Sequence, residues 1–188
     1  MSKTKNNNAV VTFNNRINIF ENTRQIIKSP NTGPTIIIPH VCNNIDLFGA
    51  GFAAAIAEEY PIVKENFHLL GKNTPLGHTQ NITVLENKSY GRKLIISNMI
   101  AQNGIISHNN KRPLNYGALS YCMYSIKSLA RDILKTTDSS SVEIHAPKFG
   151  SGLAGGNWLF IEELIKDIWL TEMNVFVYMP KIISKKQA

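Results

Sequence analysis

An unbroken apolar run is the feature of this sequence that most constrains its fold. The run begins at Thr35 and continues through three isoleucines to Pro39. A strand without polar alternation is covered on both faces, which is typical of the parallel sheets of α/β proteins. Polar residues close the run at 40–43, so a binding site can begin where this strand ends.

The rest of the chain alternates between strand-like and helix-like segments, with no linker or internal repeat. This order predicts an α/β fold, a three-layer α/β/α sandwich with a central mixed β-sheet. We expect a polar leader with a first strand at 1–15, one domain at 16–180 and a basic tail at 181–188. Strands are expected at 9–13, 16–20, 35–43, 81–85, 93–101, 141–149 and 174–179, and helices at 52–60, 62–70, 115–135 and 157–169.

Composition narrows the class of protein. The 188 residues are 43% hydrophobic and 18% charged, which suits one folded domain, and no apolar run is long enough to cross a membrane. The polar N-terminus lacks the apolar stretch of a signal peptide, so we expect a cytoplasmic protein.

A net charge of +7 favours anionic partners, but the basic residues are scattered, which makes nucleic acid an unlikely partner. Cys42 and Cys122 lie far apart and predict neither a disulfide nor a metal site.

Two glycine-rich turns each join an apolar strand to a helix. Gly49 and Gly51 precede the alanine-rich helix, and the segment 150–155 precedes the helix that contains Trp158. Glycine allows a positive φ and a close approach to a ligand, while free N–H groups and the helix dipole favour phosphate. Two such loops could hold a diphosphate from both sides. The alternative is that they are tight turns without a ligand.

The second turn also matches the dinucleotide fingerprint G-x-G-x-x-G at Gly150, Gly152 and Gly155. That fold needs several more parallel strands after the fingerprint, whereas only the segment 174–179 remains here. A nicotinamide-dinucleotide fold is therefore excluded. The sequence also lacks the G-x-x-x-x-G-K-[ST] motif of a P-loop.

From about Arg16 to Met179 the chain resembles a macrodomain, the ADP-ribose-binding fold. The segment from His40 to Asn43 occupies the place of the family's Asn-x-x-Asn, at the expected spacing before Gly49. The histidine, the second turn from Ala146 onward and the Ser-His pair at 107–108 are similar to the branch that contains the yeast-type ADP-ribose-1''-phosphate phosphatases and the terminal ADP-ribose glutamate hydrolases.

The resemblance implies binding roles for particular residues. Asn18, next to Ile19, would recognise adenine, and Asn43 would hydrogen-bond the distal ribose. His108 would act as a lid residue. The two sides of the diphosphate would be lined by Gly49, Ala50, Gly51 and Phe52, and by Ser151, Gly152, Leu153, Ala154 and Gly155.

The resemblance also implies an activity, removal of the terminal phosphate from ADP-ribose-1''-phosphate. His40 would be the catalytic residue, helped by Asn43, because imidazole titrates near neutral pH. The lysine and aspartate of the glutamate hydrolases are replaced by Gln102 and Ala154, which argues against their covalent mechanism. No metal or organic cofactor is implied, and the acidic partner proposed in the phosphatases has no secure counterpart at 90–93.

Three alternatives stay open at this point. If His40 is a buried structural histidine, the protein could be a non-catalytic reader of ADP-ribosylated protein. It could equally be a module that sequesters NAD-derived nucleotides. It could also be a hydrolase that removes ADP-ribose from macromolecules through another linkage.

Overall fold

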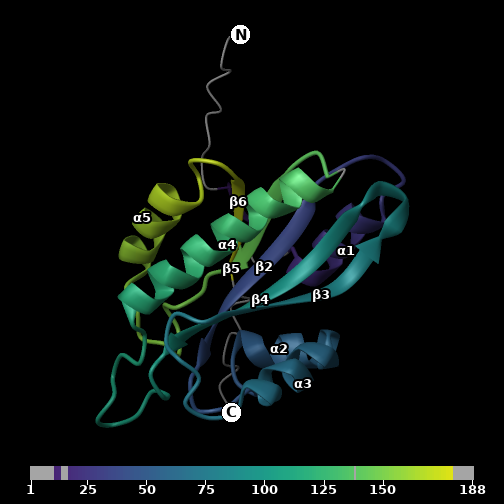
Figure 1. The fold of residues 1–188 in the computed structure, drawn as a ribbon. Helices are drawn as coiled ribbons and strands as arrows, with labels where there is room; N and C mark the ends of the chain where they lie inside the picture. Colours follow the sequence, from purple (N-terminus) through teal and green to yellow (C-terminus); the bar gives the residue numbers. More distant parts are fainter. Residues whose placement is uncertain (1–10, 14–16, 138, 180–188) are drawn as a thin grey trace, which may run out of the picture.

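The computed structural model describes residues 11–13, 17–137 and 139–179, which form a six-stranded sheet with helices on both faces (Figure 1). The strand order is β1-β6-β5-β2-β4-β3, and every neighbouring pair is parallel except the edge pair β3 and β4. The strands are β1 (Val11–Phe13), β2 (Thr35–Asn43), β3 (Thr79–Asn87), β4 (Arg92–Gln102), β5 (Val142–Pro147) and β6 (Asn174–Tyr178). The helices are α1 (Ile19–Lys28), α2 (Phe52–Glu59), α3 (Pro61–Leu70), α4 (Tyr116–Thr136) and α5 (Trp158–Ile168), with a 3₁₀ turn at Lys88–Tyr90.

The sheet separates two hydrophobic cores. Alternate residues of β2 face opposite sides: Ile36 and Ile38 pack in the core under α1, α2 and α3, whereas Ile37 packs in the core under α4 and α5. Both sides of β2 are therefore covered, as its apolar sequence predicts. The mixed sheet with helices on both faces confirms the predicted three-layer α/β/α sandwich.

The strand predicted at Arg16–Phe20 is wrong, because the chain enters α1 there. Oδ1 of Asn18 accepts hydrogen bonds from the N–H groups of Phe20, at 2.8 Å, and Glu21, at 3.2 Å, which caps the helix. The buried positions Ile19, Thr23 and Ile27 recur every four residues. The short β-prone stretch at the helix start concealed this longer helical period, and Arg16 itself lies outside the described residues.

Both cysteines are buried and form no disulfide. Trp169 is fully buried just after α5, where its indole N–H donates to the Met123 carbonyl at 2.9 Å. Trp169 is therefore part of the core. Ala9 and Val10 of the predicted first strand and the predicted basic tail lie outside the described residues, and none of the described helices is long and apolar enough to span a membrane.

Candidate functional site: two glycine loops at one sheet edge

The two predicted glycine loops both begin at the carboxyl ends of central strands of the sheet. Parallel neighbours β2 and β5 end at Asn43 and Pro147, so the first loop (residues 44–51) and the second loop (residues 148–156) leave the sheet at the same end. The loops touch: a Cβ atom added to Gly51 would lie 3.4 Å from Cδ1 of Leu153. Ligands of open α/β sheets bind outside the carboxyl ends of the strands, which is where these loops meet.

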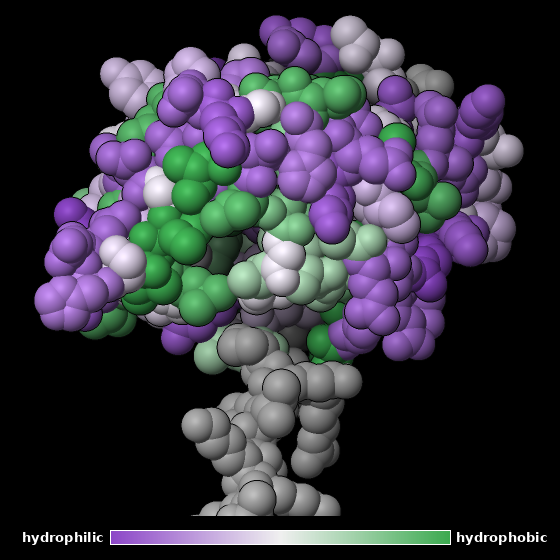
Figure 2. Space-filling model, turned by 90° about the horizontal axis from the view of Figure 1, so that it is seen from below, coloured by the Kyte–Doolittle hydropathy of each residue, from purple (hydrophilic) through white to green (hydrophobic). Residues whose placement is uncertain are grey.

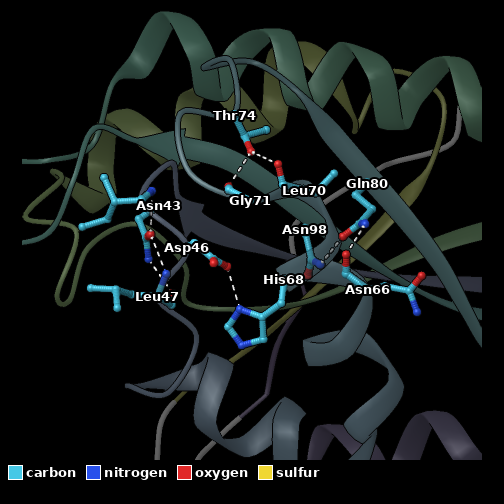
Figure 3. Close-up of polar contacts among 11 residues, drawn as sticks. Asn43, Asp46, Leu47, Asn66, His68, Leu70, Gly71, Thr74, Gln80 and Asn98 are labelled. Carbon is cyan, nitrogen blue, oxygen red and sulfur yellow. Dashed lines mark hydrogen bonds and ion pairs between the residues drawn. The ribbon is translucent and has the colours of Figure 1, made fainter.

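The first loop is shaped by the side chain of Asn43. Its Oδ1 accepts hydrogen bonds from the N–H groups of Ile45 and Leu47, both at 3.1 Å, and its Nδ2 donates to the Leu47 carbonyl at 2.6 Å (Figure 3). The side chain predicted to bind ribose therefore also fixes the loop that leads into α2. Only 8% of Asn43 is exposed.

The helix that follows the first loop begins without a capping side chain. Asn18, Asn115 and Asn157 cap α1, α4 and α5 through their side-chain oxygens. In contrast, the N-cap position of α2 is Gly51, which has a φ of 57° and no side chain to accept a hydrogen bond. Within the described residues, the N–H groups of 49–51 donate to no protein atom. The start of α2 therefore presents unpaired donors at the positive end of a helix dipole.

The second loop exposes a similar row of donors. The loop is closed by hydrogen bonds from Gly155 N–H to the Gly152 carbonyl, at 2.9 Å, and from Gly156 N–H to the Gly150 carbonyl, at 2.8 Å. Between these closures, the N–H groups of 151–154 have no acceptor among the residues that the structure describes. A run of such N–H groups is a concave anion-binding surface.

The second loop also rests on the polar loop before α4. A Cβ atom on Gly155, which has a φ of 69°, would lie 2.5 Å from the Lys111 carbonyl oxygen, so only glycine fits there. The Leu114 N–H donates to the Ala154 carbonyl at 3.1 Å, and Ala154 is buried. The side chain of Leu153 remains 55% exposed.

Apolar surface borders this region. Figure 2 views the molecule from the side on which α2 and α3 lie in Figure 1, and it shows apolar patches on either side of a hollow. The exposed side chains of the two loops include Leu47 and Leu153.

His40 lies beneath the first loop rather than in the open. It is 2% exposed, on the face of β2 that packs against α2 and α3. The rings of Phe48 and Phe52 meet its imidazole edge to face, at centroid distances of 5.6 and 6.1 Å. Burial lowers its pKa to about 4, against a smaller opposing effect of its hydrogen bond to Asn98. The imidazole is therefore neutral near pH 7.

Phe52 links the predicted adenine residues to the first loop. Its ring stacks on that of Phe20 at a centroid distance of 5.4 Å, which brings the start of α1, with Asn18 and Ile19, next to the start of α2. Ile19 is 7% exposed. Because Oδ1 of Asn18 already accepts two hydrogen bonds as the helix cap, its amide nitrogen is the freer group.

The predicted lid residue His108 is exposed on the polar loop at 102–113, where its Nδ1 lies 2.9 Å from Oδ1 of Asn109. The loop is braced by Asn110, whose amide donates to the carbonyls of Asn103 and Ile105. No hydrogen bond among the described residues ties His108 to either glycine loop.

Sequence reasoning missed two polar groupings near these loops. Asn98 of β4 contacts His40, and a polar residue inside the run of isoleucines in β4 was the available signal. Asp46 of the first loop pairs with His68 of α3, and its Oδ1 lies 2.6 Å from the histidine Nδ1 (Figure 3). No cluster of three metal-binding side chains occurs in the part of the chain that the structure describes.

No family model matches the chain. A curated relative from Lodderomyces elongisporus, named ADP-ribose 1''-phosphate phosphatase, is 26% identical over 158 residues, which cover 78% of this chain and 89% of the relative. A protein of unknown function from Bacteroides thetaiotaomicron has a solved structure with a TM-score of 0.71 and 26% identity, covering 92% of this chain and 99% of that one. A macrodomain protein from Streptomyces coelicolor has a TM-score of 0.60 and 25% identity, covering 81% and 93%. With the sheet order and the paired loops, these likenesses show that the chain has the macrodomain fold.

Proposed function

We propose that this protein binds ADP-ribose through its two glycine loops and removes the terminal phosphate of ADP-ribose-1''-phosphate. The observation that carries the proposal is the pair of unpaired N–H rows, at 49–51 and 151–154, on loops that touch between Gly51 and Leu153. A diphosphate placed between them would receive donors from both sides. The name of the Lodderomyces relative supports the choice of substrate.

The proposed reaction needs only water as a second reactant. Water attacks phosphorus, the bond between phosphorus and the ribose oxygen breaks, and the products are ADP-ribose and phosphate. Fixed N–H groups hold the charge of the substrate without reorganising during the reaction. In this proposal Asn18 and Ile19 lie beside adenine, Asn43 lies beside the distal ribose, and His40 moves the proton.

The charge of the chain is consistent with this substrate. A net charge of +7 attracts a ligand that carries several negative charges. We expect the protein to act in the cytoplasm, on free ADP-ribose-1''-phosphate or on ADP-ribosylated macromolecules that present the same diphosphate.

A second candidate is a binding module without catalysis, and the burial of His40 favours it. A histidine that is 2% exposed and covered by Phe48 and Phe52 is also what a purely structural residue looks like. The two candidates agree on ligand binding and differ only in turnover.

The deciding experiment measures phosphate release from ADP-ribose-1''-phosphate and ADP-ribose binding by calorimetry, for the wild type and His40→Gln. Glutamine can still donate to Asn98 but has no basic nitrogen. The phosphatase predicts release by the wild type only, with binding retained by both proteins. Binding without release by the wild type would establish the binding module, and absence of both would reject the ADP-ribose site.

A further inference from the structure

A row of polar side chains crosses the sheet at the level of His40. Nε2 of His40 lies 2.5 Å from Oδ1 of Asn98, its register partner on β4. Nδ2 of Asn98 donates to Oε1 of Gln80 on β3 at 2.9 Å, and Nε2 of Gln80 donates to the Asn66 carbonyl of α3 at 2.9 Å (Figure 3). Three adjacent strands and one helix thus contribute to a single chain of hydrogen bonds.

The Asn66 carbonyl, where this series of hydrogen bonds ends, fixes the orientation of both side-chain amides. A backbone carbonyl only accepts, so Gln80 must turn its NH₂ group toward Asn66 and its carbonyl oxygen toward Asn98. Asn98 then turns its NH₂ group toward Gln80 and its oxygen toward His40. That oxygen also only accepts, so the proton must sit on Nε2 of His40.

The remaining nitrogen of His40 lacks a strong partner. Because burial lowers the pKa of His40 to about 4, the ring holds one proton near pH 7, and Nδ1 keeps its lone pair. The recorded polar contact of Nδ1 is with the thiol of Cys42, a weak donor that lies 3.7 Å from Nδ1 and 3.6 Å from Nε2. Burial raises the pKa of this thiol, so Cys42 is uncharged as well.

The ring also faces the first loop. Phe48 of that loop and Phe52 of α2 lie against it, and Phe52 is only partly buried. Movement of these rings would connect Nδ1 with the space beside the unpaired N–H groups of the first loop.

We propose that Asn98 and Gln80 are positioning residues that hold His40 as its Nε2–H tautomer and leave Nδ1 as the nitrogen offered to the substrate. This inference rests on the proposed phosphatase function and names the atom that performs it. Nδ1 takes a proton from the attacking water as the new oxygen to phosphorus bond forms. The same proton passes to the ribose oxygen as its bond to phosphorus breaks, which leaves ADP-ribose and phosphate.

The first test reads the tautomer directly. Long-range ¹H–¹⁵N NMR of the ¹⁵N-labelled wild type at pH 7, with His40→Gln to assign the ring, is expected to show Nε2 protonated and Nδ1 unprotonated. A ring protonated on Nδ1 would overturn the proposal. This measurement needs no turnover, so a wild type that releases no phosphate would reject the proposed function while the spectrum still decides the tautomer.

The second test separates positioning from structure through two substitutions of Asn98. Asn98→Leu removes the acceptor, and kcat for phosphate release is expected to fall about a hundredfold with little change in KM. Asn98→Asp keeps an acceptor and adds a negative charge, which should retain the Nε2–H tautomer and move the acidic limb of the pH-rate profile to higher pH.

The matched control is Ser97→Ala. Ser97 is the next residue of β4, is fully buried and donates to Asn81 of β3 at 2.6 Å from the opposite face of the sheet. Its loss removes a similar contact between the strands and should leave kcat and the ring spectrum unchanged. Equal losses of kcat in Asn98→Leu and Ser97→Ala, or an Asn98→Leu protein with wild-type kcat, would contradict a positioning role.

Discussion

Gly51, the residue immediately before α2, lies against Leu153 of the second loop, so the two loops are in direct contact at the point where the diphosphate is proposed to bind. Gly51 has a φ of 57° and a ψ of −134°, a region of backbone conformation that only glycine adopts readily. The backbone conformation, rather than a lack of space, is what requires glycine here.

Gly51→Ala should therefore destabilise the fold by about 1–2 kcal/mol. It should also weaken ADP-ribose binding at least tenfold, because the N–H groups at the helix start would turn away from the second loop. Urea unfolding and calorimetry measure the two effects. Gly49→Ala is the stability control, since a Cβ atom there meets nothing within 4 Å and no positive φ is required. Equal stability of the two variants would contradict the prediction.

Gly156 is a second position in this loop that is predicted to tolerate no side chain, although its φ is not positive. A Cβ atom there would lie 2.4 Å from Cδ2 of Leu114 and 2.6 Å from the Gly150 carbonyl oxygen. Gly156→Ala should cost about 2–3 kcal/mol in the free energy of unfolding, because the backbone cannot move away without opening the loop closure. Gly152→Ala adds a Cβ atom into open space and should leave that free energy nearly unchanged. Denaturant titration of both variants checks the difference.

Acid should destabilise the protein through His40. Its pKa is about 4 in the folded state and near 6.5 when unfolded, so the unfolded chain binds the proton more readily. The contribution of the neutral ring is complete above pH 6.5 and is lost as the pH falls toward 4, up to a total of about 3 kcal/mol. In His40→Gln this part of the pH dependence should vanish. Urea unfolding of the wild type and His40→Gln at pH 7 and pH 4.5 tests this prediction. If the free energy of unfolding changes equally with pH in the two proteins, the prediction is wrong.

Tyr178 is predicted to be a structural residue of the sheet. Its hydroxyl accepts from Asn22 Nδ2 at 2.6 Å and lies 2.7 Å from Nδ1 of the buried His145. Tyr178→Phe should destabilise the fold by about 2 kcal/mol, because the buried His145 and the partly buried Asn22 both lose a hydrogen-bond partner. Tyr121→Phe, at a side chain that is 74% exposed, is the control and should have no effect on the melting temperature.

The sequence was sufficient to predict the sheet and both loops. The apolar run of β2 and the helical period of α4 are long enough to identify their elements, and glycine marked the turns that need a positive φ. The prediction at the start of α1 was wrong because five residues with alternating polarity resemble a strand. In the structure, the side-chain oxygen of Asn18 caps and stabilises a helix there.

The environment of His40 could not be predicted from its own segment. Its partners Asn98 and Gln80 become neighbours only through the register of β2 with β4 and of β4 with β3. His40 and Asn98 are 58 residues apart, and Asn98 and Gln80 are 18 residues apart, so the segment around His40 contains no pattern that predicts these contacts. The same is true of His68, which meets Asp46 only after α3 has packed.

The uncapped start of α2 has a consequence for how ligand binding is measured. A helix of eight residues has little stability of its own, and here no side chain completes its first turn. An anion that accepts hydrogen bonds from this turn would serve as the missing cap. Part of the measured heat and entropy of binding would then come from ordering the helix, and amide hydrogen exchange in the first turn of α2 would slow as the site fills.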